Sequence, residues 1–315
     1  MRIVIVGPGA LGSLLTARLF LVQRETGGTG NDINSLHILD YRPERAASLR
    51  EKGLLFEEGD RKIRCTPEVT VDPGVCARCD VLFFCVKAND AASALDWLQT
   101  LLSGKTVLLA MQNGIAHLEK IKTAACSAGV GITSEGATLI HPGYIRYGGR
   151  GFTRLGLLTG HSTHSEGILR KTAALLNAAG MRSEVTGNPL KYVWAKLFVN
   201  VGINALTALH GCSNGELLNI PSAREIMTRA VKEAEAVALA AGIPVDGDPV
   251  AAAFEVCRTT ADNISSMLQD VRQKRLTEID AINGAVVAEG EKLGIAMPVN
   301  SELVRMVKAL EASYA

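Results

Sequence analysis

The chain has 315 residues, of which 47% are hydrophobic and 21% are charged, and 33 Lys and Arg residues nearly balance 32 Asp and Glu residues. Because this length exceeds the roughly 250–300 residues of a single-core domain, we expect two domains. The formal net charge of +1 excludes a basic field that would attract nucleic acid. No apolar run is expected to span a membrane, and the amino terminus resembles neither a secretory signal nor a transit peptide, so we expect a cytoplasmic protein.

The amino-terminal segment predicts a strand, a glycine turn and a helix. Arg2–Val6 is apolar and rich in β-branched residues, and a helical pattern covers residues 13–21. Between them lies the turn Gly7-Pro8-Gly9-Ala10-Leu11-Gly12. In this context Gly7 permits the tight turn, Gly9 lets the backbone approach a pyrophosphate and Gly12 lets the helix pack on its strand. We predict a dinucleotide site, against the alternative of an ordinary turn between strand and helix.

The end of the second strand bears on the choice of cofactor. After a flexible loop at residues 26–32, the expected strand at 36–39 leads into Asp40-Tyr41-Arg42. An acid here accepts hydrogen bonds from the ribose of NAD, whereas an arginine accommodates the extra phosphate of NADP. Both are present, so both cofactors stay open, and we choose NADP (NADPH) with Arg42 as its partner. In the alternative, Asp40 starts a turn and Arg42 is a solvated charge before a helix at 43–52.

Polar residues follow two further buried strands. Residues 54–70 predict a hairpin, and the uninterrupted apolar run at 81–86 predicts a strand that is buried on both faces, as in a parallel sheet. Lys87 is the first charge after that run, and a strand at 106–111 leads into Gln112-Asn113-Gly114. Ligands of open α/β sheets bind at the carboxyl ends of strands, so Lys87 and Asn113 are candidates for cofactor or substrate binding. The alternatives are a solvated lysine and a plain Asn-Gly turn.

The predicted secondary structure changes near residue 188, from strands and helices to helices alone. Further strands are expected at 131–140, 144–147 and 153–158, followed by a helix at 164–179. Beyond this point the patterns are helical, at residues 189–209, 223–241, 251–274 and 278–293. We therefore predict an α/β fold in which residues 1–187 form a Rossmann-type NAD(P)-binding domain and residues 188–315 an all-α substrate-binding domain.

The cysteines and histidines predict no metal site. The close pair Cys76 and Cys79 has the spacing of redox or metal sites, but no second pair completes a zinc site, so we expect a structural loop. His161, His164 and the remaining histidines lack a cysteine or carboxylate pattern. We expect all seven cysteines to be reduced.

The helix at 189–209 carries a polar stripe. Lys196, Asn200 and Asn204 are spaced by four residues and share one face of an otherwise apolar helix. This is either a solvent-facing stripe or a site, and the apolar residues on the other faces favour a site. A lysine there can protonate a carbonyl oxygen, and the two amides can orient a polar substrate.

Two later segments add candidates. Asn263 and Ser266 are three residues apart and are expected to share a helical face that binds a carboxylate by neutral hydrogen bonds. Glu278 is expected in the first turn of the helix at 278–293. On the pattern alone, Glu278 is explained by its favourable interaction with the helix dipole.

Together these segments resemble the ketopantoate reductase family over nearly the whole chain. The matching segments are 7–12, Lys87, Asn113-Gly114, 194–204, Asn214-Gly215-Glu216, 263–270 and Thr277-Glu278-Ile279-Asp280. The resemblance implies NADPH-dependent reduction of 2-dehydropantoate to (R)-pantoate, which supplies pantothenate and coenzyme A. Open alternatives are a reductase of another 2-oxo acid or imine on the same scaffold, and a non-catalytic dinucleotide sensor.

The resemblance also implies roles for individual residues. Lys196 would be the general acid, and Glu278 would sit where substrate and cofactor meet and help to keep the lysine protonated. The implied cofactor-binding residues are Gly7, Pro8, Gly9, Ala10, Leu11, Gly12, Arg42, Lys87, Asn113, Ala137 and Glu278. The implied substrate-binding residues are Asn113, Lys196, Asn200, Asn204, Asn214, Asn263 and Ser266. The expected partner is a small-molecule keto acid, with no nucleic acid and no membrane, and exposed helix faces in the second half are compatible with a homodimer.

Overall fold

The computed structural model describes residues 1–25 and 33–314 and divides the chain into two compact units. The first unit comprises Met1–Gln112 and Leu118–Pro189, and the second comprises Asn113–His117 and Leu190–Ala315. The two units join at Pro189, close to the expected boundary, but the short segment 113–117 groups with the second unit rather than with the first. The loop expected at residues 26–32 lies outside the described residues.

The first unit is built on a sheet in the strand order β12-β11-β8-β7-β6-β1-β2-β5. Its neighbouring strands pair in parallel, except that β11 runs antiparallel to β8. The central strands are buried on both faces, which accounts for their uninterrupted apolar runs. The strands are β1 (Arg2–Val6), β2 (Ser35–Leu39), β5 (Glu68–Thr70), β6 (Val81–Phe84), β7 (Val107–Ala110), β8 (Ser127–Thr133), β11 (Thr153–Leu157) and β12 (Ser183–Val185). The predicted Rossmann-type sheet is confirmed.

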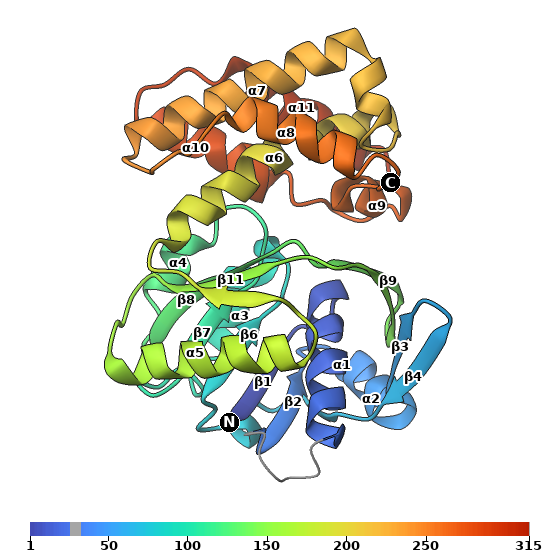
Figure 1. Ribbon diagram of the computed structural model, residues 1–315, viewed down its shortest axis with the longest axis vertical. Helices are drawn as coiled ribbons and strands as arrows, with labels where there is room; N and C mark the ends of the chain where they lie inside the picture. The colour runs from blue at the N-terminus through green and yellow to red at the C-terminus, as the bar shows by residue number, and fades with distance from the viewer. Residues whose placement is uncertain (26–32, 315) are drawn as a thin grey trace. The chain divides into compact units, whose positions relative to one another are not determined.

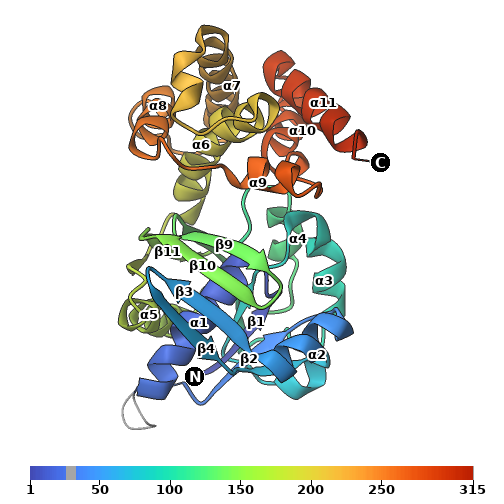
Figure 2. The same cartoon turned by 90° about the vertical axis from the view of Figure 1, so that its right-hand side faces the viewer.

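Helices cover both faces of this sheet. Figures 1 and 2 place α1 and α5 on one face and α2 and α3 on the other. The helix α5 begins at a capping box, in which the side chains of Ser162 and Ser165 each accept a hydrogen bond from the other's backbone N–H. The helices are α1 (Ala10–Glu25), α2 (Pro43–Lys52), α3 (Ala91–Trp97), α4 (Leu118–Lys122) and α5 (Thr163–Ala178).

A second, smaller sheet has the strand order β4-β3-β10-β9. Its strands are β3 (Leu54–Glu58), β4 (Arg61–Cys65), β9 (Gly136–His141) and β10 (Tyr144–Gly149). Two predictions are wrong here. The hairpin expected at 54–70 ends at Cys65, because Glu68–Thr70 pairs with β2 in the large sheet. The single strand expected at 131–140 is divided at Ser134 and Glu135, because its two halves, β8 and β9, pair in different sheets.

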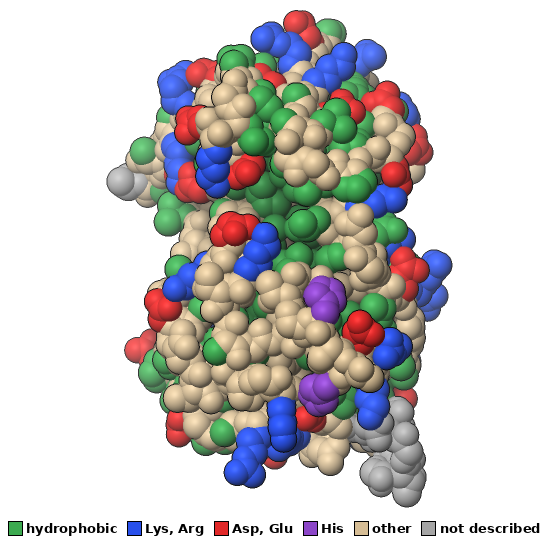
Figure 3. All heavy atoms as spheres, turned by 90° about the vertical axis from the view of Figure 1, so that its left-hand side faces the viewer, with side chains coloured by type: hydrophobic (Ala, Val, Ile, Leu, Met, Phe, Trp, Pro, Cys, Tyr) green, Lys and Arg blue, Asp and Glu red, His purple; other side chains and the backbone are tan. Residues whose placement is uncertain are grey.

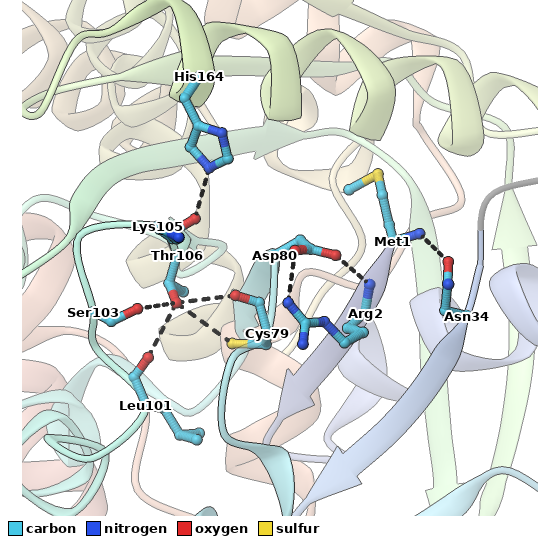
Figure 4. A network of polar contacts seen from close by, with 10 residues as sticks. All are labelled: Met1, Arg2, Asn34, Cys79, Asp80, Leu101, Ser103, Lys105, Thr106 and His164. Carbon is cyan, nitrogen blue, oxygen red and sulfur yellow. Dashed lines mark hydrogen bonds and ion pairs between the residues drawn. The ribbon is translucent and has the colours of Figure 1, made fainter.

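The amino ends of the central strands are tied together by polar contacts (Figure 4). The backbone N–H of Arg2 donates to the Asp80 carboxylate at 2.7 Å. The hydroxyl oxygen of Thr106 lies 3.0 Å from the carbonyl oxygen of Cys79 and 3.1 Å from that of Leu101. Ligands of such sheets bind at the opposite, carboxyl edge, so these contacts serve stability.

Cys76 and Cys79 belong to this structural edge. Both side chains are buried, and burial raises the pKa of Cys76 to about 12 and that of Cys79 to about 11. The thiols are therefore protonated and unreactive at neutral pH. Within residues 1–25 and 33–314, no group of three or more His, Cys, Asp or Glu side chains is arranged to hold a metal ion.

The second unit is helical, and its described part contains no strand. Its helices are α6 (Pro189–His210), α7 (Pro221–Ala240), α8 (Pro249–Thr259), α9 (Ser266–Arg272), α10 (Ala285–Lys292) and α11 (Pro298–Ala312), with a π-helix at Asp280–Gly284. Buried residues of α6, α7 and α10, among them Phe198, Val231 and Val286, form one apolar core. The helical second domain is confirmed, but the helix expected at 251–274 is divided into α8 and α9, and α11 was not predicted.

The helix α6 corrects the expectation that no apolar run is long enough to span a membrane. It has 22 residues and passes that test by length and composition. Most of its apolar stretch is buried inside the second unit, as is typical of a core helix.

On the face drawn in Figure 3, Lys and Arg side chains are interspersed with Asp and Glu, so this face carries no extended field of one sign.

Candidate active site

The glycine turn of the first unit fits a dinucleotide. It connects β1 to α1, and Gly9 N donates to Gly7 O at 2.8 Å. A Cβ atom at Gly12 would lie 2.2 Å from the Gly7 carbonyl oxygen, so only glycine permits this close approach. A Cβ atom at Gly9 would meet no atom within 4 Å, which leaves the backbone open on that side. An open backbone before a helix N-terminus is the arrangement that binds a pyrophosphate.

Asp40, the predicted ribose partner, has a fully buried side chain. Arg45 of α2 binds both of its carboxylate oxygens, with Nη2 at 2.7 Å from Oδ1. The Arg42 N–H donates to the same Oδ1 at 3.1 Å. The Arg42 side chain is itself exposed, and its Nε donates to the Tyr41 hydroxyl at 3.2 Å. The carboxylate that would favour NAD is thus neutralised by an internal partner, whereas the arginine that would favour NADP lies at the surface.

Arg45 is a residue that sequence reasoning missed. In the sequence it is one of several charges in the helix at 43–52, and nothing in that pattern distinguishes it. It meets Asp40 because the turn between β2 and α2 is short. The sequence did contain a signal for such a partner, namely an acidic residue at the end of a buried strand. A buried carboxylate requires a cation or several hydrogen-bond donors.

Lys87 and Ala137 lie on other elements of the first unit. Lys87 follows β6 and comes one residue after Val86, whose backbone nitrogen lies 3.0 Å from the Cβ position of Gly7. Lys87 is therefore next to the glycine turn. Ala137 lies on β9 and packs, partly buried, against the core to which α1 contributes. Of the remaining residues of the turn, Pro8 is buried and Ala10 and Leu11 are half-buried.

The predicted polar stripe is present on α6. Asn204 is buried, and Lys196 and Asn200 are half-buried. Burial lowers the pKa of Lys196 to about 8, and the negative charge of Glu278 opposes this by raising it. An ammonium group with such a pKa is protonated at neutral pH and gives up its proton more readily than a surface lysine.

Asn113 and Glu278 meet in the second unit. The Asn113 Nδ2 donates to the Glu278 Oε2 at 3.1 Å. The Ile115 N–H donates to the Ala281 carbonyl oxygen at 3.1 Å. Gly114, with φ of +78°, lies so close to Ala281 that a Cβ atom would be 1.9 Å from that carbonyl oxygen. The segment 113–117 is thus fixed against the chain around Glu278.

Asn263 and Ser266 do not share a helical face, so that expectation is wrong. The helix α8 ends at Thr259, and Asn263 lies in the turn before α9. The Ser265 hydroxyl accepts a hydrogen bond from Leu268 N at 3.1 Å and so caps a new helix, which is why the pattern does not continue. Asn263 and Ser266 are nevertheless both exposed at the start of α9.

Asn214 is tied to the same turn. Its N–H donates to the Asn263 carbonyl oxygen at 3.0 Å, and its Nδ2 donates to the Thr260 hydroxyl at 2.8 Å. The Thr207 hydroxyl of α6 lies 2.6 Å from that of Ser265. The second unit therefore joins the candidates on α6 to those around Asn263 through direct polar contacts.

Two family descriptions match the chain. "Ketopantoate reductase PanE/ApbA" matches residues 3–160, and "Ketopantoate reductase PanE/ApbA C terminal" matches residues 188–311. A 2-dehydropantoate 2-reductase of Halobacterium salinarum is 37% identical over 311 residues, which cover 98% of each chain. A second, of Vibrio cholerae, is 34% identical over 319 residues, covering 100% of this chain and 99% of the other.

Solved structures agree with these matches. A PanE/ApbA family ketopantoate reductase from Ralstonia eutropha superposes with a TM-score of 0.87 at 26% identity, covering 100% of this chain and 99% of the other. A D-mandelate dehydrogenase in complex with NADH and anilino(oxo)acetate superposes with a TM-score of 0.86 at 27% identity and the same coverage. The chain belongs to the ketopantoate reductase family of dinucleotide-dependent oxidoreductases.

Proposed function

We propose that this protein reduces 2-dehydropantoate to (R)-pantoate with NADPH, with Lys196 as the proton donor. The observation that carries the proposal is the half-buried Lys196 beside Glu278, on the same helical stripe as Asn200 and Asn204. The names of the relatives that cover the whole chain support the choice of substrate. We also propose that the NAD(P)-binding domain ends at residue 187, that the substrate-binding domain begins at residue 188, and that the protein is located in the cytoplasm.

The chemistry assigned to the side chains follows from their charges. Bound NADPH would supply a hydride to the carbonyl carbon of the substrate, so negative charge would develop on the carbonyl oxygen. The Lys196 ammonium donates a hydrogen bond to that oxygen and then transfers a proton to it, which leaves a neutral amine and a hydroxyl group. The amine recovers its proton from solvent. Glu278 stabilises the ammonium, and its hydrogen bond from Asn113 restricts where the carboxylate points.

Recognition of the keto acid is assigned to neutral groups. Asn200 and Asn204 lie one and two turns from Lys196, where their amides can bind the substrate carboxylate and hydroxyl group. Asn263 and Ser266 offer an exposed amide and hydroxyl at the start of α9. Asn214 stabilises that turn through its hydrogen bonds to Thr260 and Asn263. We therefore assign Asn214 an indirect role in substrate binding, because it positions the turn that carries Asn263.

We assign the cofactor preference to Arg42 and Asp40. Asp40 is occupied by Arg45 and is not free to accept from a ribose hydroxyl, whereas the exposed Arg42 guanidinium is suited to a 2′-phosphate. In the first unit, the turn 7–12 with Lys87 and the backbone of Ala137 would hold the rest of the cofactor. In the second unit, Asn113 and Glu278 would lie at its reactive end.

A second candidate is the reduction of another 2-oxo acid, such as an aromatic one. It is favoured by the likeness to the D-mandelate dehydrogenase, which covers the whole chain. Pockets on one scaffold differ in the side chains that accept the substrate, so the same fold is compatible with both kinds of 2-oxo acid.

The deciding experiment measures oxidation of NADPH by the purified protein with ketopantoate, beside NADH and a panel of 2-oxo acids. Efficient turnover of ketopantoate with NADPH supports the proposal. Turnover of an aromatic 2-oxo acid with little turnover of ketopantoate selects the second candidate. Light scattering on the same sample tests for the homodimer.

A further inference from the structure

The chain around Glu278 has an irregular backbone. Glu278 lies just before the π-helix Asp280–Gly284, a form that is rare and is often found at functional sites. Side chains of the π-helix also bind neighbouring elements, since Asn283 donates hydrogen bonds to Val201 and Asn300. The described contacts identify α11 as such an element.

The helix α11 runs alongside this segment and binds it at three levels. Near its start, Asn300 Oδ1 accepts a hydrogen bond from Asn283 Nδ2 at 2.9 Å. Further along, the Lys308 ammonium pairs with Asp280. Near its end, Glu311 binds Thr277. The pairs join 300 to 283, 308 to 280 and 311 to 277, so helix and segment are antiparallel, and Figure 2 shows α11 beside α10, which continues the segment.

The contact of Glu311 with Thr277 bears most directly on Glu278. The Glu311 Oε1 accepts hydrogen bonds from Thr277 N and from Thr277 Oγ1, both at 2.7 Å. The same Oγ1 accepts from Ile279 N at 3.2 Å. Glu311 therefore fixes the residue before Glu278 directly and the residue after it through one hydroxyl group. Thr277 and Ile279 are fully buried, so these polar groups have no access to water that would replace a lost partner.

The helix α11 is itself anchored elsewhere. Glu233 of α7 accepts hydrogen bonds from Val299 N and Asn300 N, each at 2.9 Å, and so caps the first turn of α11. Asn283 Nδ2 also donates to the Val201 carbonyl oxygen at 3.2 Å, in the helix that bears Lys196. Residues 277–284, the segment that contains Glu278, are thus bound both to α6 and to α11, which has its own contacts with α7.

We propose that Glu311 is a positioning residue for Glu278, and that through Thr277 it holds the Glu278 carboxylate against Asn113 and near Lys196. The expected effect of Glu311 on kcat rests on the proposed function, whereas its effect on the position of the Glu278 carboxylate does not. Lys308 pairs with Glu311, Tyr314 lies close enough for the Glu311 charge to act on it, and the charge of Glu278 acts on Lys196.

Four variants test the proposal. Glu311→Ala removes the acceptor, whereas Glu311→Gln keeps an amide oxygen that can accept from both groups of Thr277. Thr277→Val removes the hydroxyl that links Glu311 to Ile279 N. Glu302→Ala is the matched control, because Glu302 is an exposed glutamate of α11 that pairs with Arg305.

We expect Glu311→Ala and Thr277→Val to lower kcat on the order of 10- to 100-fold, as a small misplacement of a reacting group does. The loss falls on kcat more than on KM, and the alkaline limb of the kcat profile moves to lower pH because Glu278 no longer supports the charge of Lys196. Glu311→Gln recovers most of kcat, and Glu302→Ala matches the unaltered protein.

A measurement without turnover separates this inference from the proposed function. The pKa of Lys196 is read by NMR from protein labelled with ¹³C at lysine Cε, with its signal identified by Lys196→Arg. We expect that pKa to fall in Glu311→Ala and Thr277→Val and to be unchanged in Glu302→Ala. Melting temperatures are measured for all variants. If Glu311→Ala does not fold, Thr277→Val and Glu311→Gln carry the test. A variant that melts earlier but leaves the pKa of Lys196 unchanged would reduce Glu311 to a purely structural role and overturn the proposal.

Discussion

Asn113 and Glu278 are 165 positions apart in the chain, yet the amide of one donates to the carboxylate of the other at 3.1 Å. The contact joins a residue that follows β7 of the large sheet to a residue just before the π-helix. Because Glu278 also acts on the charge of Lys196, the three residues form a connected polar group in the second unit.

Lys196→Ala tests the proton donor. We expect kcat to fall by about 10²- to 10⁴-fold, the usual contribution of a positioned general acid, with binding of NADPH retained. Steady-state kinetics and a fluorescence titration with NADPH measure the two quantities. Lys191→Ala is the matched control, because Lys191 lies on the same helix and pairs with Asp246. Turnover by Lys196→Ala at nearly the original rate would exclude the assigned mechanism.

The pH dependence of kcat tests the electrostatics of the same group. The proposed reaction requires the protonated lysine, and the pKa of Lys196 is about 8, so kcat should fall as the pH rises through that value. Glu278→Gln removes the negative charge that raises this pKa, and the fall should then begin at lower pH. A profile whose alkaline limb stays in place in Glu278→Gln would show that the limb belongs to another group.

Lys196→Met tests what the buried charge costs in stability. The pKa of Lys196 is lower in the folded protein than the usual 10.5, so the unfolded chain binds the proton more strongly. The stability of the original protein should therefore rise with pH between about 8 and 10.5. Lys196→Met should increase the free energy of unfolding at neutral pH by on the order of 1 kcal/mol, and denaturant titrations at several pH values check this. If Lys196→Met is less stable than the original protein, the favourable interactions of the Lys196 ammonium outweigh the free-energy cost of burying its charge.

Arg42→Ala tests the choice of cofactor. The exposed Arg42 guanidinium is assigned to the phosphate that distinguishes NADPH, so its loss should weaken NADPH binding by about 1.5–3 kcal/mol and leave NADH binding nearly unchanged. Dissociation constants for both cofactors, measured by fluorescence, give this comparison directly. Arg50→Ala is the control, because Arg50 lies in the last turn of α2, at the opposite end of the helix that Arg42 precedes. Equal losses for NADPH and NADH would contradict the assignment.

Gly114→Ala tests the docking of segment 113–117. Its added Cβ would lie 1.9 Å from the Ala281 carbonyl oxygen, and φ at this residue is +78°. Gly59→Ala is the matched control, since Gly59 also has a positive φ, of +57°, but open space around the Cβ position. The control should cost about 1–2 kcal/mol from backbone strain alone, and Gly114→Ala clearly more. Similar melting temperatures for the two variants would mean that the segment moves away from Ala281 without loss.

Much of the fold followed from local patterns. Continuous apolar runs predicted the central strands, and the glycine turn between β1 and α1 predicted the dinucleotide fold. The helix α6 was predicted with its polar stripe, because four-residue spacing depends only on the helix itself. Two local signals were overlooked, namely Ser265 as an N-cap that divides α8 from α9 and Pro298 at the start of α11.

Other features could not be predicted because they depend on tertiary contacts. The π-helix at Asp280–Gly284 is bound along α11, and the pattern of residues 278–293 reads equally well as a regular helix. The pairing of Asp40 with Arg45 decides whether that carboxylate is free, yet only the fold brings the two together. The contact of Asn113 with Glu278 likewise depends on the path of the whole chain.

The helical unit includes residues 113–117, which lie in the chain between β7 and α4 of the sheet unit. A cut after residue 189 would separate the helices from Asn113 and Ile115. Glu278 and the Ala281 carbonyl oxygen would then lose the hydrogen bonds that these two residues donate. The two halves are therefore not interchangeable modules. A fragment made of the helices alone would need residues 113–117 grafted onto it, and a chimaera of two relatives must take this loop from the parent of its helices.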